Sequence, residues 1–587
     1  MTASPADGEA TPPLAVHQRI LAVLTDPRLY WVLAPAAVFA FLLGCFGYLT
    51  WEPLEGSEHV HYSLSDALYG SSKLFFLHAA PQPESQVGLA LDVARYLAPI
   101  VAGWAALIAL IALLHDRAQR MLIPLRRNHV VLCGLGDVGF ELLRVLRAAN
   151  YRVVVIEADA RNPRIEACRQ WGGPVIVGDA QLKSTLEAAG VKRAARLLAV
   201  TPDDVVNTEI VTRARRLVKG SRRLLCLARV NNPSLCVFLR IEESNHGDDE
   251  SALDFFNADE IGARLLLEAH PFDTATQPHI LLAHLDTLGS ELVMNAARRW
   301  QDERADSSAP LLVTVVDDDA DQRIGSLLAN YPVLEQVCEF TAYCTSARDL
   351  QRLSTARPAV PISRAYVTAQ RDEQTVETAL KLRHALDSAV PVVAALWQAY
   401  GVADLLENST TQHGTNLTVF RTIQQTCSVD LVEGGSFEAI AHEIHRRYCL
   451  MQPDGVNPPP WSELDESLKK SNRAQARHIG VKLRSIGCEI TPLRDWQAKD
   501  FTFTSDELTK LSIMEHDRWE QEKRDAGVKS DPHFLPWDQL PTDIAEWDTN
   551  FIRAIPAMLA SVGLQIVDVR EAAARYPNAA ATAGTHP

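Results

Sequence analysis

The clearest chemistry in the sequence is a glycine pattern between two apolar segments. Residues 128–139 read NHVVLCGLGDVG, in which Gly134, Gly136 and Gly139 follow a short apolar stretch and precede FELLRVLRAA at helical spacing. The next apolar segment, YRVVVIE, ends at Glu157. Glycines permit a tight turn and a close backbone approach, and free N–H groups at a helix start bind phosphate. A carboxylate at the end of the second strand accepts hydrogen bonds from ribose hydroxyls. The pattern therefore predicts a strand–turn–helix site for a nucleotide.

Further strand-like segments continue the alternation that such a site requires. They are PVIVGDA (174–180), LLAVTPDDVVN (197–207) and LLCLARVNNP (224–233). With the glycine pattern, they make residues 128–245 similar to the TrkA-N domain, the Rossmann lobe of RCK proteins (regulators of potassium conductance). The resemblance implies a doubly wound α/β fold and, in that family, a position directly after a pore helix.

The resemblance also implies which residues meet a ligand. Gly134, Gly136, Gly139, Glu157 and Asp179 are expected to contact a nucleotide, and Thr201 to line the pocket. Asp203, Asp204 and Asn207 are expected instead to cap the following helix and hold the loop. Glu157 suits two free ribose hydroxyls and repels a 2′-phosphate, so NAD(H), ATP and ADP all remain open as ligands. A lobe with an empty pocket is the alternative.

An enzyme is the less favoured interpretation. Hydride transfer needs a proton-relay His, Lys or Tyr in a substrate domain beside the nicotinamide. The downstream sequence has no such pairing at a recognisable spacing, so no catalytic residue is predicted and a regulatory lobe is expected. The cysteines are scattered without a CxxC pair, and no metal site is expected.

Two uncharged segments near the N-terminus predict membrane spans. Leu29–Leu49 and Tyr96–Leu114 are each about 30 Å long as helices, enough to cross the hydrocarbon core of a bilayer. The charged residues between the two segments are mainly acidic, whereas Arg117, Arg120 and Arg126 follow the second segment. The positive-inside rule then places both chain ends in the cytoplasm, with a cytoplasmic tail at 1–28. Two buried core helices are the alternative.

The connecting stretch at 61–80, HYSLSDALYGSSKLFFLHAA, resembles the pore helix of two-span potassium channels. No TVGYG filter follows it, and Lys73 places a positive charge near the expected mouth. A pore-helix-like re-entrant segment within a membrane part at 29–115 is the preferred interpretation. A re-entrant or extracellular cap that conducts nothing is the alternative.

A second, altered copy of the glycine template follows. In HILLAHLDTLGSELVMNAARRW (279–300), the three glycine positions hold His284, Asp286 and Gly289. Alternating segments predict a second, degenerate Rossmann-like domain at 278–410, without phosphate binding. Residues 246–277 are expected to form a crossover helix between the lobes, and 411–460 a connector.

The C-terminal part combines a helix carrying Glu515, His516, Arg518 and Trp519 with the segment HFLPWDQLP, which contains Trp537. These elements resemble the RyR domain named for ryanodine receptors, here over 461–570. The resemblance implies a small all-α module, and the five residues are candidates for ligand contact. Core packing is the alternative for the tryptophans, and a structural ion pair with Glu515 for Arg518. Basic residues between Lys469 and Arg484 are expected to form a solvated face, and the tail at 571–587 to be disordered.

Composition limits the remaining function classes. Of 587 residues, 47% are hydrophobic and 22% charged, which excludes a disordered chain, and the net charge of −16 disfavours nucleic acid as a partner. We therefore expect a bacterial inner-membrane protein with several passes, potassium-channel-like and regulated by ligands. Two spans cannot enclose a pore, so conduction requires a homo-oligomer, with a tetramer expected. A membrane-anchored sensor without a pore is the alternative.

Overall fold

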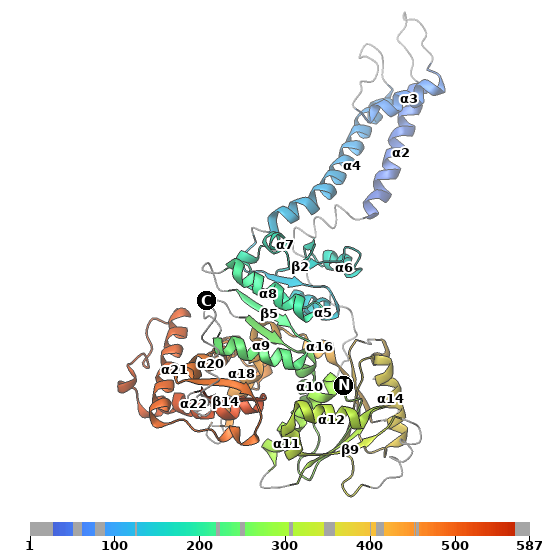
Figure 1. The fold of residues 1–587 in the computed structure, drawn as a ribbon. Coiled ribbons are helices and arrows are strands. Elements are labelled where there is room, and N and C mark those ends of the chain that lie inside the picture. The colour runs from blue at the N-terminus through green and yellow to red at the C-terminus, as the bar shows by residue number, and fades with distance from the viewer. Residues whose placement is uncertain are drawn as a thin grey trace, which may run out of the picture. The chain divides into compact units, whose positions relative to one another are not determined.

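The computed structural model describes residues 27–50, 62–76, 88–123, 126–218, 224–246, 253–304, 309–345, 358–398, 401–406, 416–450, 452 and 457–569. It divides into two compact units (Figure 1). The first comprises residues 1–126 and 166–176, and the second comprises 127–165 and 177–587. The predicted tails lie outside the described residues, apart from positions 27 and 28.

Three helices make up most of the first unit: α2 (Pro27–Leu49), α3 (Leu64–Leu74) and α4 (Leu89–Leu122) (Figure 1). Their shared core contains Ala40, Ala67, Leu74, Leu91 and Ala94. Glycine permits the close approach of α2 to α4, because a Cβ on Gly47 would lie 2.7 Å from the Leu91 backbone nitrogen. Small residues at such contacts are typical of helices packed in a membrane, where close backbone approach replaces the hydrophobic driving force.

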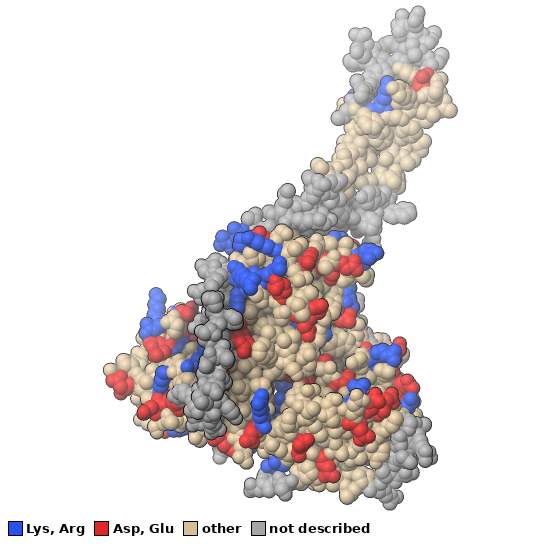
Figure 2. Space-filling view, in the orientation of Figure 1, with Lys and Arg blue, Asp and Glu red and all other residues tan. Residues whose placement is uncertain are grey.

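The outward faces of α2 and α4 are apolar. Exposed side chains include Phe39, Phe46, Ile100 and Trp104, and in Figure 2 the described surface of these helices is almost free of charge. By length and composition, one helix of the described residues, Leu89–Leu110 with a mean hydropathy of 1.7, could cross a membrane. The apolar part of α2 covered by the same test is shorter, Leu33–Leu49. The span expected at Leu29–Leu49, and with it the two-span arrangement, therefore stays a prediction.

The expected pore-helix-like segment contains α3. Ser63 caps this helix, because its hydroxyl accepts from the Asp66 N–H at 3.3 Å and the Asp66 carboxylate accepts from the Ser63 N–H at 3.1 Å. Lys73 Nζ lies over the Tyr69 ring, 4.2 Å from its centroid. Residues 77–87, where a filter would follow, lie outside the described residues.

A six-stranded sheet forms the first lobe, in the order β3-β2-β1-β4-β5-β6. Its strands are β1 (Val130–Cys133), β2 (Val153–Glu157), β3 (Val175–Val177), β4 (Arg196–Ala199), β5 (Leu225–Arg229) and β6 (Leu253–Phe256). The helices between them are α5 (Asp137–Ala148), α6 (Arg164–Gln170), α7 (Lys183–Ala188), α8 (Asp204–Val218) and α9 (Pro233–His246). Residues 253–256 were expected within the crossover helix, but they pair with β5 as the edge strand. The helix, α10 (Ala258–Ala269), begins only after Asn257, whose side chain caps it by accepting from Glu260 N–H.

The second sheet repeats this order, as β9-β8-β7-β10-β11-β12. Its strands are β7 (His279–Ala283), β8 (Leu311–Val316), β9 (Cys338–Tyr343), β10 (Arg364–Thr368), β11 (Val392–Leu396) and β12 (Leu417–Arg421). Helices α11 (Thr287–Glu303), α12 (Ala320–Asn330) and α14 (Asp372–Ala385) accompany them. The sheet extends beyond residue 410, the expected end of this domain, because β12 pairs in parallel with β11. After β12, the short α16 (Thr422–Thr426) approaches α10, where a Cβ on Gly262 would lie 2.9 Å from Thr422 Cγ2.

The C-terminal part is mainly helical. Its helices are α17 (Val429–Gly434), α18 (Glu438–Leu450), α19 (Glu466–Arg477), α20 (Ile479–Ser485), α21 (Ser505–Asp525) and α22 (Thr542–Ser561). The expectation of an all-α module is wrong, because β13 (Cys488–Pro492) and β14 (Leu564–Asp568) form an antiparallel pair that buries Ile490 and Ile566. Ile440 and Ile444 of α18 lie in the same core, so a part of the expected connector belongs to this module.

The expectation that the basic residues between Lys469 and Arg484 form a solvated face is also wrong in part. Arg473 is 2% exposed and bonds Glu438 at 2.6 Å, Glu466 at 2.6 Å and Asp430 at 2.8 Å. Lys482 is fully buried. Acidic side chains of the same helix and of neighbouring helices compensate these charges, which makes their burial tolerable.

Candidate functional site

The glycine loop after β1 is held by close backbone packing. Gly134 has a φ of +97°, a conformation that favours glycine, and its Cα faces Thr201 at the end of β4. A Cβ on Gly139 would overlap the Gly134 carbonyl oxygen. These two glycines therefore fix the shape of the turn from strand to helix.

The middle glycine of the motif, Gly136, leaves the start of α5 open. Gly136 is the N-cap residue and provides no side-chain hydrogen bond to the helix. Apart from the adjoining backbone, no atom of the described residues lies within 4 Å of the position that a Cβ on Gly136 would occupy. In the described part of the chain, no side chain caps the first turn of α5. Its N–H groups can therefore donate hydrogen bonds to an anion, which the positive end of the helix dipole also attracts.

Glu157, at the end of β2, is buried and holds the glycine loop. One carboxylate oxygen accepts from Leu135 N–H at 2.7 Å and from Asn162 Nδ2 at 3.2 Å. The other accepts from Asp159 N–H at 2.9 Å. A carboxylate has about four acceptor positions, so one remains for a ribose hydroxyl. The ribose contact stays a prediction, and the structure adds a loop-holding role.

Thr201 and Asp179 occupy different settings. The Thr201 hydroxyl and N–H both donate to Asn207 Oδ1, at 2.8 and 2.9 Å, beside Gly134. Asn207 and Asp203 thus hold the loop and cap α8, as expected from the sequence, with Asp203 accepting from Val205 N–H at 2.8 Å. Asp179 is exposed after β3 and accepts from Gln181 N–H at 2.8 Å. Thr201 therefore meets the glycine loop directly, whereas Asp179 forms a local turn.

Sequence reasoning missed Arg164. Its guanidinium donates to the Leu135 carbonyl at 3.3 Å and to Asp137 Oδ1 at 2.5 Å, so a positive charge lies against the glycine loop. Asn162 donates to the same carbonyl at 3.2 Å. A single arginine and asparagine in a loop after β2 carry no distinctive spacing, so no sequence signal identified them.

The second lobe reaches the same loop. Gln398, directly after β11, donates through Nε2 to Asp137 Oδ1 at 2.8 Å. The Arg229 guanidinium lies 5.7 Å from the Trp397 ring centroid. Burial at this junction lowers the pKa of Arg229. The first lobe's ligand loop is therefore coupled to residues of the second.

In the second lobe the corresponding loop is closed. His284 takes the place of Gly134 with a φ of +66°, and its imidazole bonds the Thr378 hydroxyl at 2.9 Å. Asp286 takes the place of Gly136 and caps α11, accepting from Gly289 N–H at 2.9 Å. A carboxylate of the chain itself thus occupies the position where a phosphate would bind. The loss of phosphate binding here stays a prediction that this geometry favours.

In the C-terminal module, the five candidate residues fall into two groups. Glu515 is buried between Lys482, at 2.7 Å, and Arg518, at 2.8 Å. Burial alone would raise the pKa of Glu515, but these two cations hold it below its usual value. Arg518 also bonds Glu522 at 2.5 Å, so its guanidinium is engaged by carboxylates of its own helix.

The second group is aromatic. The His516 ring stacks near Trp519, with centroids 5.7 Å apart, and lies edge-on to Trp537 at 6.2 Å. Its Nε2 is 3.3 Å from the Leu535 carbonyl oxygen. Both tryptophans are half-buried, and their packing around His516 joins the turn at 533–541 to α21.

Comparisons with known proteins concern mainly the first lobe. A family model described as the TrkA-N domain matches residues 130–246. A Trk system potassium uptake protein TrkA homolog from Archaeoglobus fulgidus is 36% identical over 104 residues, 18% of this chain and 22% of the relative. Potassium channel protein 1 from Methanocaldococcus jannaschii is 25% identical over 120 residues, 20% of this chain and 35% of the relative.

Among solved structures, the GsuK channel bound to NAD is 15% identical, covering 81% of this chain and 92% of that chain with a TM-score of 0.38. GsuK bound to ADP is 19% identical, covering 71% and 99% with a TM-score of 0.36. The chain spans at most about a third of the curated relatives it matches, 14% to 35% of their lengths. The glycine loop, the strand order and the family match agree over one segment: residues 130–246 are a TrkA-N domain, related to those of potassium uptake and potassium channel proteins.

Proposed function

We propose that this chain is a potassium-channel-like protein of a bacterial inner membrane, regulated by an adenine nucleotide in its TrkA-N lobe. The observation that carries the proposal is the uncapped start of α5 at Gly136, with open space in front of it. A diphosphate would bind the free N–H groups there, and Arg164, which is ion-paired with Asp137, lies against the same loop. NAD(H), ADP and ATP remain the candidate ligands. The role is regulatory rather than enzymatic.

The membrane part of the proposal rests on α2 and α4. Their apolar outward faces and the close contact at Gly47 are what a pair of spanning helices requires. With two spans, both chain ends lie in the cytoplasm, and a homo-oligomer, expected to be a tetramer, would surround a pore. The C-terminal RyR-type module would sense a further ligand. The alternative is a membrane-anchored nucleotide sensor that conducts no ion, which the charge of Lys73 favours.

Calorimetry on the full-length protein in detergent tests the nucleotide site. NAD, ADP or ATP should bind the wild type, and Gly136→Asp should weaken binding at least a hundredfold, because the new carboxylate would cap α5 as Asp286 caps α11. Gly325→Asp is the matched control: a Cβ there also meets no atom within 4 Å, but Gly325 lies on α12, far along the chain from the loop. Equal affinity in wild type and Gly136→Asp would refute the site.

Potassium flux into liposomes tests conduction separately. Nucleotide-dependent flux in the wild type that is lost in Gly136→Asp supports the channel. Nucleotide binding without flux of any monovalent cation supports the non-conducting sensor instead.

A further inference from the structure

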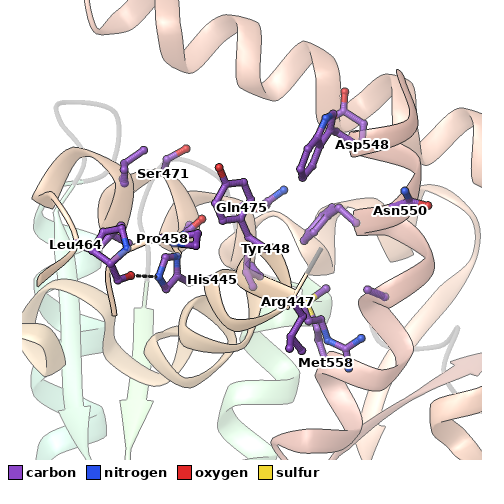
Figure 3. Close-up of a pocket in the computed structure, with 18 of the residues that line it drawn as sticks. His445, Arg447, Tyr448, Pro458, Leu464, Ser471, Gln475, Asp548, Asn550 and Met558 are labelled. Carbon is purple, nitrogen blue, oxygen red and sulfur yellow. Dashed lines mark hydrogen bonds between the residues drawn. The ribbon is translucent and has the colours of Figure 1, made fainter. Parts of the chain in front are cut away.

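The C-terminal module contains a cavity that none of the five candidate residues lines. It has a volume of about 660 Å³ and lies between α18, residues 457–464, α19 and α22 (Figure 3). Volumes of about 300–1,000 Å³ are typical of small-molecule sites. The size alone therefore permits a ligand of one or two rings.

Two aromatic rings form one wall. Tyr448 of α18 and Trp547 of α22 are each 44% exposed, and their ring centroids lie 5.7 Å apart with a tilt of 36°. Further apolar surface comes from Ile444, Leu464, Leu468, Phe551, Ala554 and Met558. Large aromatic side chains left open to solvent beside an apolar wall offer a stacking surface for a planar ring.

Gln475 and Asp548, both labelled in Figure 3, are polar residues of the lining. Gln475 donates through Nε2 to Glu515 Oε1 at 3.0 Å. Because a carboxylate only accepts, the amide orientation is fixed and the carbonyl oxygen of Gln475 remains as an acceptor. Asp548 lies 3.4 Å from His516 Nδ1, beside the buried Lys482–Glu515–Arg518 cluster. Burial, reinforced by Glu515, raises the pKa of Asp548 to about 7, although Arg518 and Lys482 oppose this.

The lining offers acceptors, together with amide and hydroxyl groups such as those of Asn472 and Ser471, but little positive charge. Among the residues that line the cavity, Arg447 is the one arginine or lysine, and its Nε already donates to Glu443 at 2.7 Å. Phosphate sites use unengaged arginines, lysines or helix N-termini. The lining therefore favours a ligand that donates hydrogen bonds and carries no phosphate.

We propose that this cavity binds a planar nitrogen heterocycle without a phosphate group, of the size of a purine or pyrimidine nucleoside. The ring stacks on Tyr448 and Trp547, and its N–H or amino group donates to Asp548 and to the Gln475 carbonyl oxygen. The inference rests on the proposed role of this module as a sensor, and it gives that role a different site from the cluster around Arg518.

Calorimetry with adenosine, guanosine, cytidine and AMP tests the proposal on the full-length protein. The titrations are made in wild type and in Gly136→Asp, so that binding in the first lobe and in the module are told apart. At least one nucleoside should bind both proteins equally, and AMP should bind the module no better than adenosine. If the first lobe binds no nucleotide, wild type and Gly136→Asp should give the same titration curves, and nucleoside binding in the module should be unaffected.

Variants locate the site. Trp547→Ala removes an exposed ring, and Asp548→Asn keeps the shape but loses the carboxylate; each should weaken nucleoside binding at least tenfold, about 1.4 kcal/mol. Asp543→Asn, an exposed position on the same helix outside the cavity, should change affinity less than twofold. Melting temperatures without ligand check that the variants remain folded. No nucleoside binding in wild type, affinity unchanged in Asp548→Asn, or tight binding confined to AMP would each overturn the proposal.

Discussion

The two Rossmann lobes share a framework that extends to individual hydrogen bonds. In the first, Leu135 N–H donates to Glu157 at 2.7 Å; in the second, Leu285 N–H donates to Asp317 at 2.9 Å. An arginine binds the leucine carbonyl in each lobe, Arg164 in the first at 3.3 Å and Arg323 in the second at 3.1 Å. The acidic residue at the end of the second strand therefore holds the loop through the same hydrogen bond in both lobes, independently of any contact with a ligand.

The lobes differ at the helix start. Gly136 leaves α5 uncapped, whereas Asp286 closes α11 with its own carboxylate. The second lobe thus keeps the packing role of the loop, and the Asp286 carboxylate caps the helix start that the first lobe leaves open. Comparing them separates what the loop does for the fold from what it does for a nucleotide, and the following predictions test that separation.

The largest effect is expected for Gly139→Ala. The new Cβ would overlap the Gly134 carbonyl oxygen, which is backbone and cannot move away, so we expect a loss of about 3 kcal/mol or more in the free energy of unfolding. Gly289→Ala should cost less, because its Cβ would lie 2.7 Å from the His284 oxygen and 2.8 Å from a Thr368 hydroxyl that can rotate. Thermal denaturation measures both. Equal melting of Gly139→Ala and the control Gly325→Ala would contradict the packing role.

Asn207→Ala should be the next most damaging. Asn207 is fully buried and bonds Thr201 through N–H, hydroxyl and carbonyl, and also the Arg229 carbonyl. Its removal leaves buried backbone groups unpaired, at about 2–3 kcal/mol. The counterpart Thr375 accepts only from Ala369 N–H at 3.2 Å and donates weakly to Arg371, so Thr375→Ala should cost about 1 kcal/mol. A larger loss for Thr375→Ala in urea denaturation would reverse this ranking.

The junction between the lobes should make stability depend on pH. Burial first, and the neighbouring Asp286, raise the pKa of Asp259 to about 6, while Arg229 opposes them. The folded chain therefore holds a proton that the unfolded chain has released, so stability should fall as pH rises from about 4 to about 6. Asp286→Asn removes the like charge, and with it the titration of Asp286, whose own pKa burial also raises; it should reduce that fall by about 1 kcal/mol. Melting temperatures at pH 4.5 and 6.5 test this; an unchanged difference in the variant would refute the coupling.

The smallest effect concerns support of one lobe by the other. Gln398→Ala removes the hydrogen bond to Asp137 at the start of α5 and should weaken nucleotide binding about threefold, about 0.6 kcal/mol. Gln322→Ala, an exposed position on α12, is the control for calorimetry. A loss beyond tenfold would mean that Gln398 contacts the ligand itself, and no loss would mean that the junction is passive.

Sequence patterns predicted the glycine loop well because its constraints are local. The positive φ of Gly134 and the contact of Gly139 with the Gly134 carbonyl are set within a few residues, and Asn207 could be assigned to its own loop for the same reason. Residues 253–256 were misassigned because LDFF continues the helical spacing of the next segment, and only pairing with β5 makes it a strand.

Contacts between distant segments were not predictable. Arg164 reaches the loop from a position with no motif, and Gln398 meets Asp137 across 261 positions. The burial of Arg473 depends on Asp430, Glu438 and Glu466 from other segments or turns, so a run of basic residues looked like a solvated face. The sequence shows which residues carry a charge, but only the fold shows which charged residues are in contact.

The cap that Asp286 places on α11 bears on how steeply the protein responds to a nucleotide. If this cap keeps nucleotides out of the second lobe, as predicted, each chain offers one Rossmann site instead of two, and an isolated chain titrates hyperbolically. A Hill coefficient above one would then report communication between chains, since none can arise between the two lobes of one chain. The shape of a binding curve thus becomes an assay for assembly, and dilution that lowers the coefficient towards one would measure how tightly the chains associate.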